Sequence, residues 1–189
     1  MREHAGSAGL TLKPFVLSAL LKRGKLRPDS MFRCRGRLAI GNRRFDCTHT
    51  PIVTPIRADT ALAYSCNCFV AHAAEQFGPS ELAGELISAG FTYGTSLAGS
   101  GEFTGRLQSE TTPDGQCVRA LGETAVLTTQ AEIALAYRQL AINVDRPENA
   151  TISDGLEGGM EFGTAQQGLR ESKWGKTGST RTSTGDFIA

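Results

Sequence analysis

The chain has 189 residues, of which 40% are hydrophobic and 21% are charged. This composition is too apolar for an intrinsically disordered chain and is sufficient for the core of one domain over residues 1–189. The formal net charge of +1 gives no field that would favour a nucleic acid or a membrane surface, so we expect no nucleic-acid partner.

The N-terminal region predicts neither export nor anchoring. Residues 1–6 lack the basic region and the long apolar stretch of a secretory signal. The longest apolar runs, such as Phe15 to Leu21, are much shorter than the roughly 20 residues that cross a bilayer. We therefore expect no signal and no membrane segment in this chain.

The first part of the chain predicts a buried helix followed by a β-hairpin. The stretch from Pro14 to Lys22 is almost continuously apolar, and Gly24 can end that helix. Two strand-like runs, residues 37–40 and 43–45, flank Gly41-Asn42, a pair that is typical of a tight hairpin turn.

This hairpin would bring Cys34 close to Cys47 and His49. Such proximity admits a cross-strand disulfide or the corner of a metal site. Zinc normally requires four well-placed ligands, and no convincing fourth is evident. Cys66 and Cys68 lie in a helical pattern that would point them to different sides rather than at one metal. We therefore expect half-buried thiols in a β-ribbon, two packing cysteines, and no metal or other cofactor.

The middle of the chain predicts further helices separated by loops. One continuous helix is expected over residues 59–77, and another over residues 80–89 with Ser80 as its N-cap. Abundant glycine, serine and threonine predict loops over residues 91–116. Thr129 and Glu132 have the spacing of a capping box ahead of a third helix.

The C-terminal part predicts a link, a helical fragment and a strand. Glycines over residues 155–159 suggest the link, residues 160–168 the fragment, and residues 173–178 the strand.

Three short patterns carry the chemical interest of the sequence. Each is common by chance when taken alone. They are Leu10-Thr11-Leu12-Lys13-Pro14-Phe15, then Ser65-Cys66-Asn67, then Lys176-Thr177-Gly178-Ser179-Thr180. In this order they resemble the nucleophile-lysine, Ser-x-Asn and Lys-Thr-Gly motifs of penicillin-binding transpeptidases, the serine acyl-transfer domains that β-lactams inhibit. The flanking residues 61–64 and 163–165 are also similar to the family.

The resemblance implies the α+β fold of serine β-lactamases and transpeptidases. The chain would supply largely the helical part of that fold plus the Lys-Thr-Gly strand, truncated at both ends, with most of the central antiparallel sheet missing. The resemblance further implies a peptidoglycan stem peptide as substrate, β-lactams as inhibitors, and a location at the periplasmic face of the cell envelope.

The resemblance also assigns roles to residues of the first two motifs. Lys13 would take the proton of a serine nucleophile, because a nearby amine of lowered pKa can act as a base. Ser65 would relay a proton towards the leaving group. Asn67 would hold both the substrate amide and Lys13.

The third motif would bind substrate. The Lys176 ammonium and the Thr177 hydroxyl would anchor the substrate carboxylate. Gly178 would leave room for the approaching backbone. Ser179 follows the triplet, where a backbone amide would form the oxyanion hole together with the amide of the nucleophile.

The nucleophile position departs from the family pattern. Leu10 lies three residues before Lys13, where the family has serine, and leucine cannot form an acyl-enzyme. Gly6-Ser7 is similar to the family's Gly-Ser pair, as though three residues followed it as an insertion. Ser7 is therefore the candidate nucleophile, provided that an irregular segment folds it back towards the lysine. Thr11 is a weaker candidate, since it is only two residues from Lys13.

Three functions stay open at this stage. The first is a penicillin-binding D,D-transpeptidase, inactive in this form if Ser7 cannot act. The second is a non-catalytic module that recognises wall peptides. The third is a serine β-lactamase or β-lactam sensor, which ranks lower because the sequence shows no deacylation base in a suitable motif.

Overall fold

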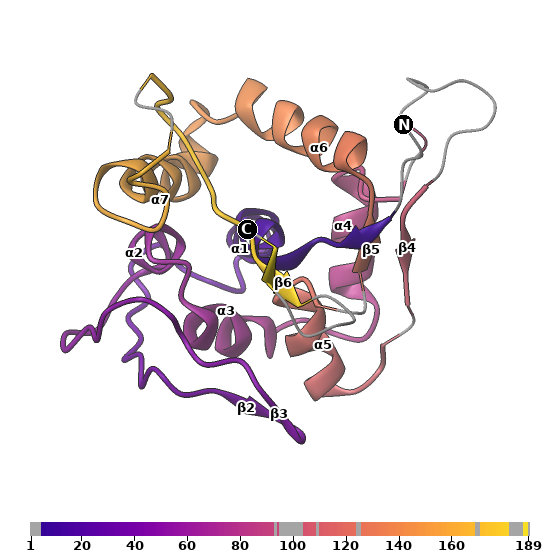
Figure 1. Ribbon diagram of the computed structural model, residues 1–189, viewed down its shortest axis with the longest axis horizontal. Helices are drawn as coiled ribbons and strands as arrows, with labels where there is room; N and C mark the ends of the chain where they lie inside the picture. The colour runs from indigo at the N-terminus through magenta and orange to yellow at the C-terminus, as the bar shows by residue number, and fades with distance from the viewer. Residues whose placement is uncertain are drawn as a thin grey trace.

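The computed structural model describes residues 5–92, 94, 104–108, 110–123, 126–168, 171–181 and 187–188. In Figure 1, helix α1 lies at the centre and the other helices surround it. The helices are η1 (Gly9–Leu12), α1 (Lys13–Lys22), α2 (Ala58–Ala63), α3 (Asn67–Ala74), α4 (Glu81–Ser88), α5 (Pro113–Ala120), α6 (Gln130–Ile142), η3 (Pro147–Asn149) and α7 (Ala150–Glu161). The strands are β1 (Gly6–Ser7), β2 (Ala39–Ile40), β3 (Arg43–Arg44), β4 (Arg106–Leu107), β5 (Val126–Thr128), β6 (Thr180–Arg181) and β7 (Phe187–Ile188).

Helix α1 occupies the centre because nearly all of its surface is apolar. Its buried residues extend from Lys13 to Leu20 with a single interruption at Ser18. The helix ends at Lys22 with Arg23 as its C-cap, and Gly24 follows in the left-handed conformation with φ +66°. The predicted helix and its glycine terminus are confirmed.

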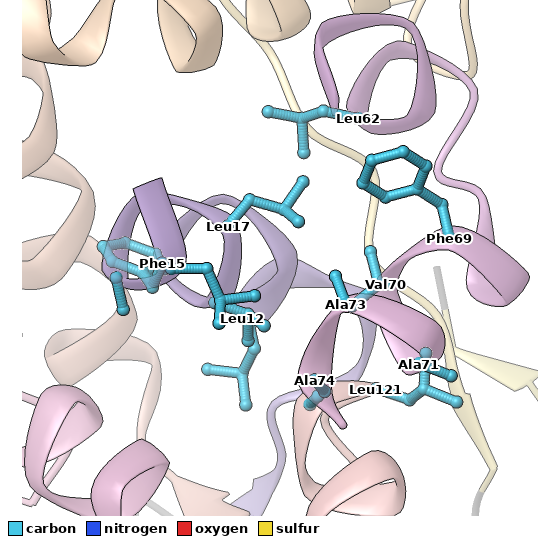
Figure 2. Packing of buried hydrophobic residues seen from close by; sticks show 14 of the residues in the cluster. Leu12, Phe15, Leu17, Leu62, Phe69, Val70, Ala71, Ala73, Ala74 and Leu121 are labelled. Carbon is cyan, nitrogen blue, oxygen red and sulfur yellow. The ribbon is translucent and has the colours of Figure 1, made fainter. Parts of the chain in front are cut away.

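Side chains of α1, α2 and α3 pack together in the core. Figure 2 shows Leu17 of α1 directed towards Leu62 of α2 and Phe69 of α3. The Phe15 ring packs edge-on against the rings of Phe91 and Tyr137, with centroids 4.9 and 5.1 Å apart. Because α1 is enclosed in this way, the polar residue at its start, Lys13, lies in the interior.

The small sheets have short antiparallel pairings. Strand β5 lies between β1 and β4, and Ser7 pairs with Leu127. The hairpin of β2 and β3 pairs Ile40 with Arg43 around Gly41-Asn42, and Gly41 has φ +54°. The predicted hairpin turn is confirmed.

The single helix predicted over residues 59–77 is wrong. The chain forms two helices there, α2 and α3, with a break at Tyr64 to Cys66. Ser65 takes the left-handed conformation with φ 53°, which ends the first helix. The Cys66 sulfur then accepts a hydrogen bond from the Phe69 amide and caps the second helix. An apolar pattern continues across such a break, so periodicity alone could not reveal it.

Two other helices differ from the prediction. Helix α5 begins at Pro113, inside the region expected to be loops, and Thr112 caps it by accepting a hydrogen bond from the Gly115 amide. The part of that loop prediction on residues 95–103 lies outside the described residues. Ser80 occupies the N-cap position of α4, but with φ 61° and without a side-chain capping bond. The Thr129–Glu132 capping box of α6 is confirmed.

The predictions for the C-terminal region are also corrected. Residues 155–159 lie inside helix α7 and form no link, and the helix ends at Glu161, before most of the fragment expected over residues 160–168. Residues 173–178 form no strand, and strand β6 begins only at Thr180. The glycines serve close packing, because Gly155 of α7 lies directly against Leu62 and the Asp59 carbonyl of α2.

Within the described ranges, no helix combines the length and apolar character that crossing a membrane requires.

Two glycine substitutions test the packing of α7 against α2. A Cβ at Gly155 would lie 2.9 Å from the Asp59 carbonyl oxygen, whereas a Cβ at Gly84 in α4 would meet nothing within 4 Å. We expect Gly155→Ala to destabilise the chain by about 1–3 kcal/mol through overpacking. Gly84→Ala should stabilise it by about 0.5–1 kcal/mol through helix propensity. Urea unfolding followed by circular dichroism measures both, and equal effects would contradict the close packing.

Candidate active site

A cluster of polar side chains surrounds the start of helix α1. Lys13 Nζ donates hydrogen bonds to Ser65 O and Asn67 Oδ1, both at 2.5 Å, and lies 3.2 Å from Ser65 Oγ. Lys176 Nζ donates to the same Ser65 Oγ at 2.8 Å. The structure thus brings together predicted site residues from all three motifs.

The break between α2 and α3 gives Ser65 its position. A left-handed backbone is uncommon for a residue other than glycine and persists only where neighbouring contacts hold it. Here Lys13 binds both the carbonyl and the hydroxyl of Ser65, which is buried. The same backbone turn therefore ends a helix and directs two oxygens of one residue at the amine.

Asn67 links the cluster to the β2–β3 hairpin. Its Nδ2 donates to Phe45 O at 2.9 Å and to Asp46 O at 3.2 Å, while its Oδ1 accepts from Lys13. A side-chain amide can donate and accept at once, which a carboxylate cannot. The identity and orientation of this residue are thus determined by contacts on both sides.

The two lysines of the cluster have lowered pKa values. Burial is the main cause of a pKa well below the ordinary value at Lys13, which is fully inaccessible, and the nearby charge of Lys176 adds to it. Burial also lowers the pKa of Lys176 to about 7. In its neutral form the Lys13 amine would have two hydrogens, for which Ser65 O and Asn67 Oδ1 are acceptors, and one lone pair that could accept a proton. This is the arrangement that a proton acceptor needs.

The Lys-Thr-Gly segment lies beside the start of the central helix. Thr177 Oγ1 donates to Thr164 Oγ1 at 2.8 Å. A Cβ at Gly178 would clash with the Thr11 side chain, so glycine is required for this approach. The Leu10 amide donates to Ser179 O at 3.4 Å, so the Ser179 carbonyl lies opposite the motif's nucleophile position.

Ser7 lies apart from this cluster. Its hydroxyl donates to Gly122 O at 2.5 Å, and its backbone belongs to strand β1. The hydrogen bonds of Lys13 go to Ser65 and Asn67 instead. The structure therefore does not bring Ser7 and Lys13 together, and the nucleophilic role of Ser7 stays a prediction.

A pocket of about 460 Å³ adjoins Lys176. It is lined by Thr11, Gln130, Ile133, Ala134, Tyr137, Leu156, Trp174, Gly175 and Lys176. Among the described residues, the Trp174 Nε1 donor has no hydrogen-bond partner. The Tyr137 hydroxyl donates to Thr11 O at 2.8 Å. The motif analysis missed Tyr137, Trp174 and Thr164; only Thr164 had a signal, in the family-like residues 163–165.

The cysteines depart from the prediction in one respect. Cys34 Sγ lies 3.7 Å from both Cys47 Sγ and His49 Nε2, so the predicted proximity is confirmed, and all of these thiols are free. Cys66 and Cys68 were expected to point to different sides, but their sulfurs lie 3.7 and 3.5 Å from Cys47 Sγ. The reason is the helix break, which puts Cys66 at a cap rather than inside a helix.

Comparisons with known proteins agree with this geometry. The family model described as penicillin binding protein transpeptidase domain matches residues 5–149. No curated protein matches the sequence. A solved structure of a peptidoglycan synthase complex aligns over 95% of this chain with TM-score 0.82 and 24% identity.

Two further solved structures are similar. Penicillin-binding protein 2 of Pseudomonas aeruginosa aligns over 93% of this chain with TM-score 0.79 and 18% identity. The TP domain of penicillin-binding protein 3 of Burkholderia pseudomallei aligns over 96% with TM-score 0.83 and 16% identity. This chain covers 37%, 50% and 62% of the three matched chains, respectively.

At these identities the solved structures show a common fold, which agrees with the predicted α+β architecture. The family model covers well over half of the sequence and contains the residues of the first two motifs. The chain therefore belongs to the penicillin-binding protein transpeptidase domain family.

Proposed function

We propose that this chain binds the D-alanine end of peptidoglycan stem peptides without forming an acyl-enzyme. The observation that carries the proposal is the assembled cluster of Lys13, Ser65, Asn67 and Lys176 beside a leucine at the nucleophile position. As in other members of the family, the protein would act at the cell envelope, and β-lactams would be ligands of the same site.

The binding groups support peptide recognition. A lysine beside a hydroxyl, as at Lys176 and Thr177, suits a terminal carboxylate, which accepts charge-assisted hydrogen bonds. The adjoining pocket offers the apolar side chains of Ile133, Leu156 and Trp174 for the remainder of the peptide.

The groups needed for acyl transfer are incomplete. Leucine has no nucleophilic atom, and the Leu10 amide, which would serve the oxyanion hole, donates to Ser179 O. Thr11 Oγ1 donates to Ala8 O, and Ser7 Oγ donates to Gly122 O. Transpeptidation through Ser7 is therefore the alternative that the labelling experiment must exclude.

Restoring the motif serine tests this proposal directly. We expect no covalent label when the full chain is incubated with a fluorescent penicillin. Leu10→Ser should become labelled, because a serine there lies one helical turn before the Lys13 amine, whose pKa is lowered by burial. Denaturing electrophoresis and mass mapping of residue 10 measure the outcome.

Two variants control this experiment. Leu10→Ala should stay unlabelled, since it removes the leucine without adding a hydroxyl. Label on the original chain that disappears in Ser7→Ala would refute the proposal and establish Ser7 as a nucleophile.

Removing the Lys176 ammonium should weaken peptide binding. A hydrogen bond to a charged group contributes about 1.5–3 kcal/mol, so Lys176→Ala should raise the Kd of a D-Ala-D-Ala-ended peptide roughly 10- to 100-fold. Lys22→Ala is the matched control, because that exposed lysine lies at the opposite end of α1 from Lys13. Isothermal titration calorimetry measures both. Equal Kd values for the two variants would place the carboxylate elsewhere.

Peptide binding should depend on pH near neutrality. Lys176, with a pKa of about 7, is charged at lower pH and neutral at higher pH. Its close neighbours Lys13 and Ser65 carry no negative charge that would compete with the substrate carboxylate for the ammonium. Affinity for the carboxylate should therefore fall as the pH rises from about 6 to about 8. Titrations across this range check the trend, and Lys176→Arg, which keeps its charge, should flatten it. A flat profile for the original chain would contradict the role of Lys176.

A further inference from the structure

A cluster of sulfur and nitrogen atoms lies behind the Ser-x-Asn motif. The ligand atoms of Cys34, Cys47, His49 and Cys66 all lie within 4.8 Å of one another. Three of the separations are 3.7 Å: Cys34 Sγ to Cys47 Sγ, Cys34 Sγ to His49 Nε2, and Cys47 Sγ to Cys66 Sγ. None of these thiols is paired in a disulfide.

These separations match the distances between the ligand atoms of a tetrahedral metal ion and are too long for a disulfide bond. With Zn–S near 2.3 Å and Zn–N near 2.0 Å, a tetrahedron has edges of about 3.8 Å between sulfurs and about 3.5 Å between sulfur and nitrogen. A disulfide would need about 2.05 Å. We propose that Cys34, Cys47, His49 and Cys66 bind one structural zinc ion.

The orientation of His49 suits a metal ligand. Its Nδ1 lies 2.8 Å from the Thr50 carbonyl, so Nδ1 carries the hydrogen and Nε2 keeps its lone pair. That lone-pair nitrogen is the atom beside Cys34 Sγ. Metal-binding histidines commonly donate their other N–H to a carbonyl in this way, which fixes the tautomer and the ring orientation.

Backbone amides support each of the three sulfurs. The amide of Gly36 donates to Cys34 Sγ at 3.3 Å. The amide of Cys68 donates to Cys47 Sγ at 3.5 Å, and the amide of Phe69 donates to Cys66 Sγ at 3.4 Å. Hydrogen bonds of this kind hold ligand atoms in a fixed orientation around a metal.

The fifth nearby atom, Cys68 Sγ, is directed to a different partner. It lies 3.5 Å from Cys47 Sγ, but it donates to Arg37 O at 3.6 Å and is not among the four ligand atoms that all lie within 4.8 Å of one another. Three thiolates and one imidazole form a closed ligand set that is typical of structural zinc and leaves no position for a reacting water. The site is thus structural, and it does not depend on the proposed peptide-binding function.

Zinc at this position would fasten the hairpin to the candidate active site. Cys34 and Cys47 lie on either side of β2 and β3, while Cys66 is the middle residue of Ser-x-Asn. The regular pairing in that hairpin is only two residues long on each strand. A metal would supply order that such short strands cannot.

Metal content and cobalt spectroscopy test the proposal on the full chain, purified in reductant. We expect one zinc per chain by inductively coupled plasma mass spectrometry. Cobalt in its place should show the visible bands of a tetrahedral ion and a thiolate charge-transfer band. Cys34→Ser and Cys47→Ser should lose the metal. Cys117→Ser should retain it, because that buried thiol donates to Ala71 O away from the cluster.

The variant His49→Cys gives a test that does not depend on losing the metal, so that a folding defect cannot produce the expected result. It should still bind cobalt, with a stronger charge-transfer band, because four thiolates replace three. A folded, reduced chain that takes up neither zinc nor cobalt overturns the proposal. Retention of metal by both Cys34→Ser and Cys47→Ser does so as well. A Cys34–Cys47 disulfide in the isolated protein, with no zinc uptake after reduction, would instead identify a redox pair.

Discussion

The enclosed amine of Lys13 is the interaction on which the site depends. A charged amine without a counter-ion is costly to bury, so burial favours the neutral form, and its N–H groups must find acceptors. Ser65 and Asn67 provide those acceptors from the turn between α2 and α3. The amine therefore joins the central helix to this turn, and the left-handed backbone of Ser65 is stabilised by the same contacts.

The Ser65–Asn67 turn serves two surroundings at once. Its outer residues face Lys13, whereas its middle residue, Cys66, faces the sulfur cluster. Asn67 also binds two carbonyls of the hairpin. Adjacent residues of this turn contact both the hairpin and Lys13. An interaction that fixes the hairpin in place therefore also fixes the polar groups beside Lys13. The proposed zinc site would act in this indirect way, by positioning rather than by chemistry.

The proposed function separates recognition from reaction. Lys13, Ser65 and Lys176 occupy one connected network although the motif position before them holds Leu10. A fold can keep a binding site after the reacting atom is lost, because packing and hydrogen bonding, not nucleophilicity, hold the site together. Membership of the family therefore describes the scaffold, and the proposal that the chain does not form an acyl-enzyme depends on the side chain at residue 10.

The sequence by itself determined the features that depend on neighbouring residues. The continuous apolar run of α1 required a buried helix, Gly41-Asn42 required a tight turn, and Thr129 with Glu132 formed a capping box. The three motifs also indicated the family, because their residue types and order are specific together. Leu10 was evident in the same way, since the position is defined by its spacing from Lys13.

Only the tertiary structure decided the features that depend on distant contacts. The break at Ser65 persists because Lys13, 52 residues away, binds both of its oxygens. Gly155 lies inside helix α7, and glycine is suited to this position because a Cβ there would clash with Leu62 of α2. Cys66 meets Cys47 only through that break, and the Ser7 hydroxyl is bonded to Gly122, 115 residues further on. Local periodicity contains no information on such partners, because packing between segments far apart in the chain selects them.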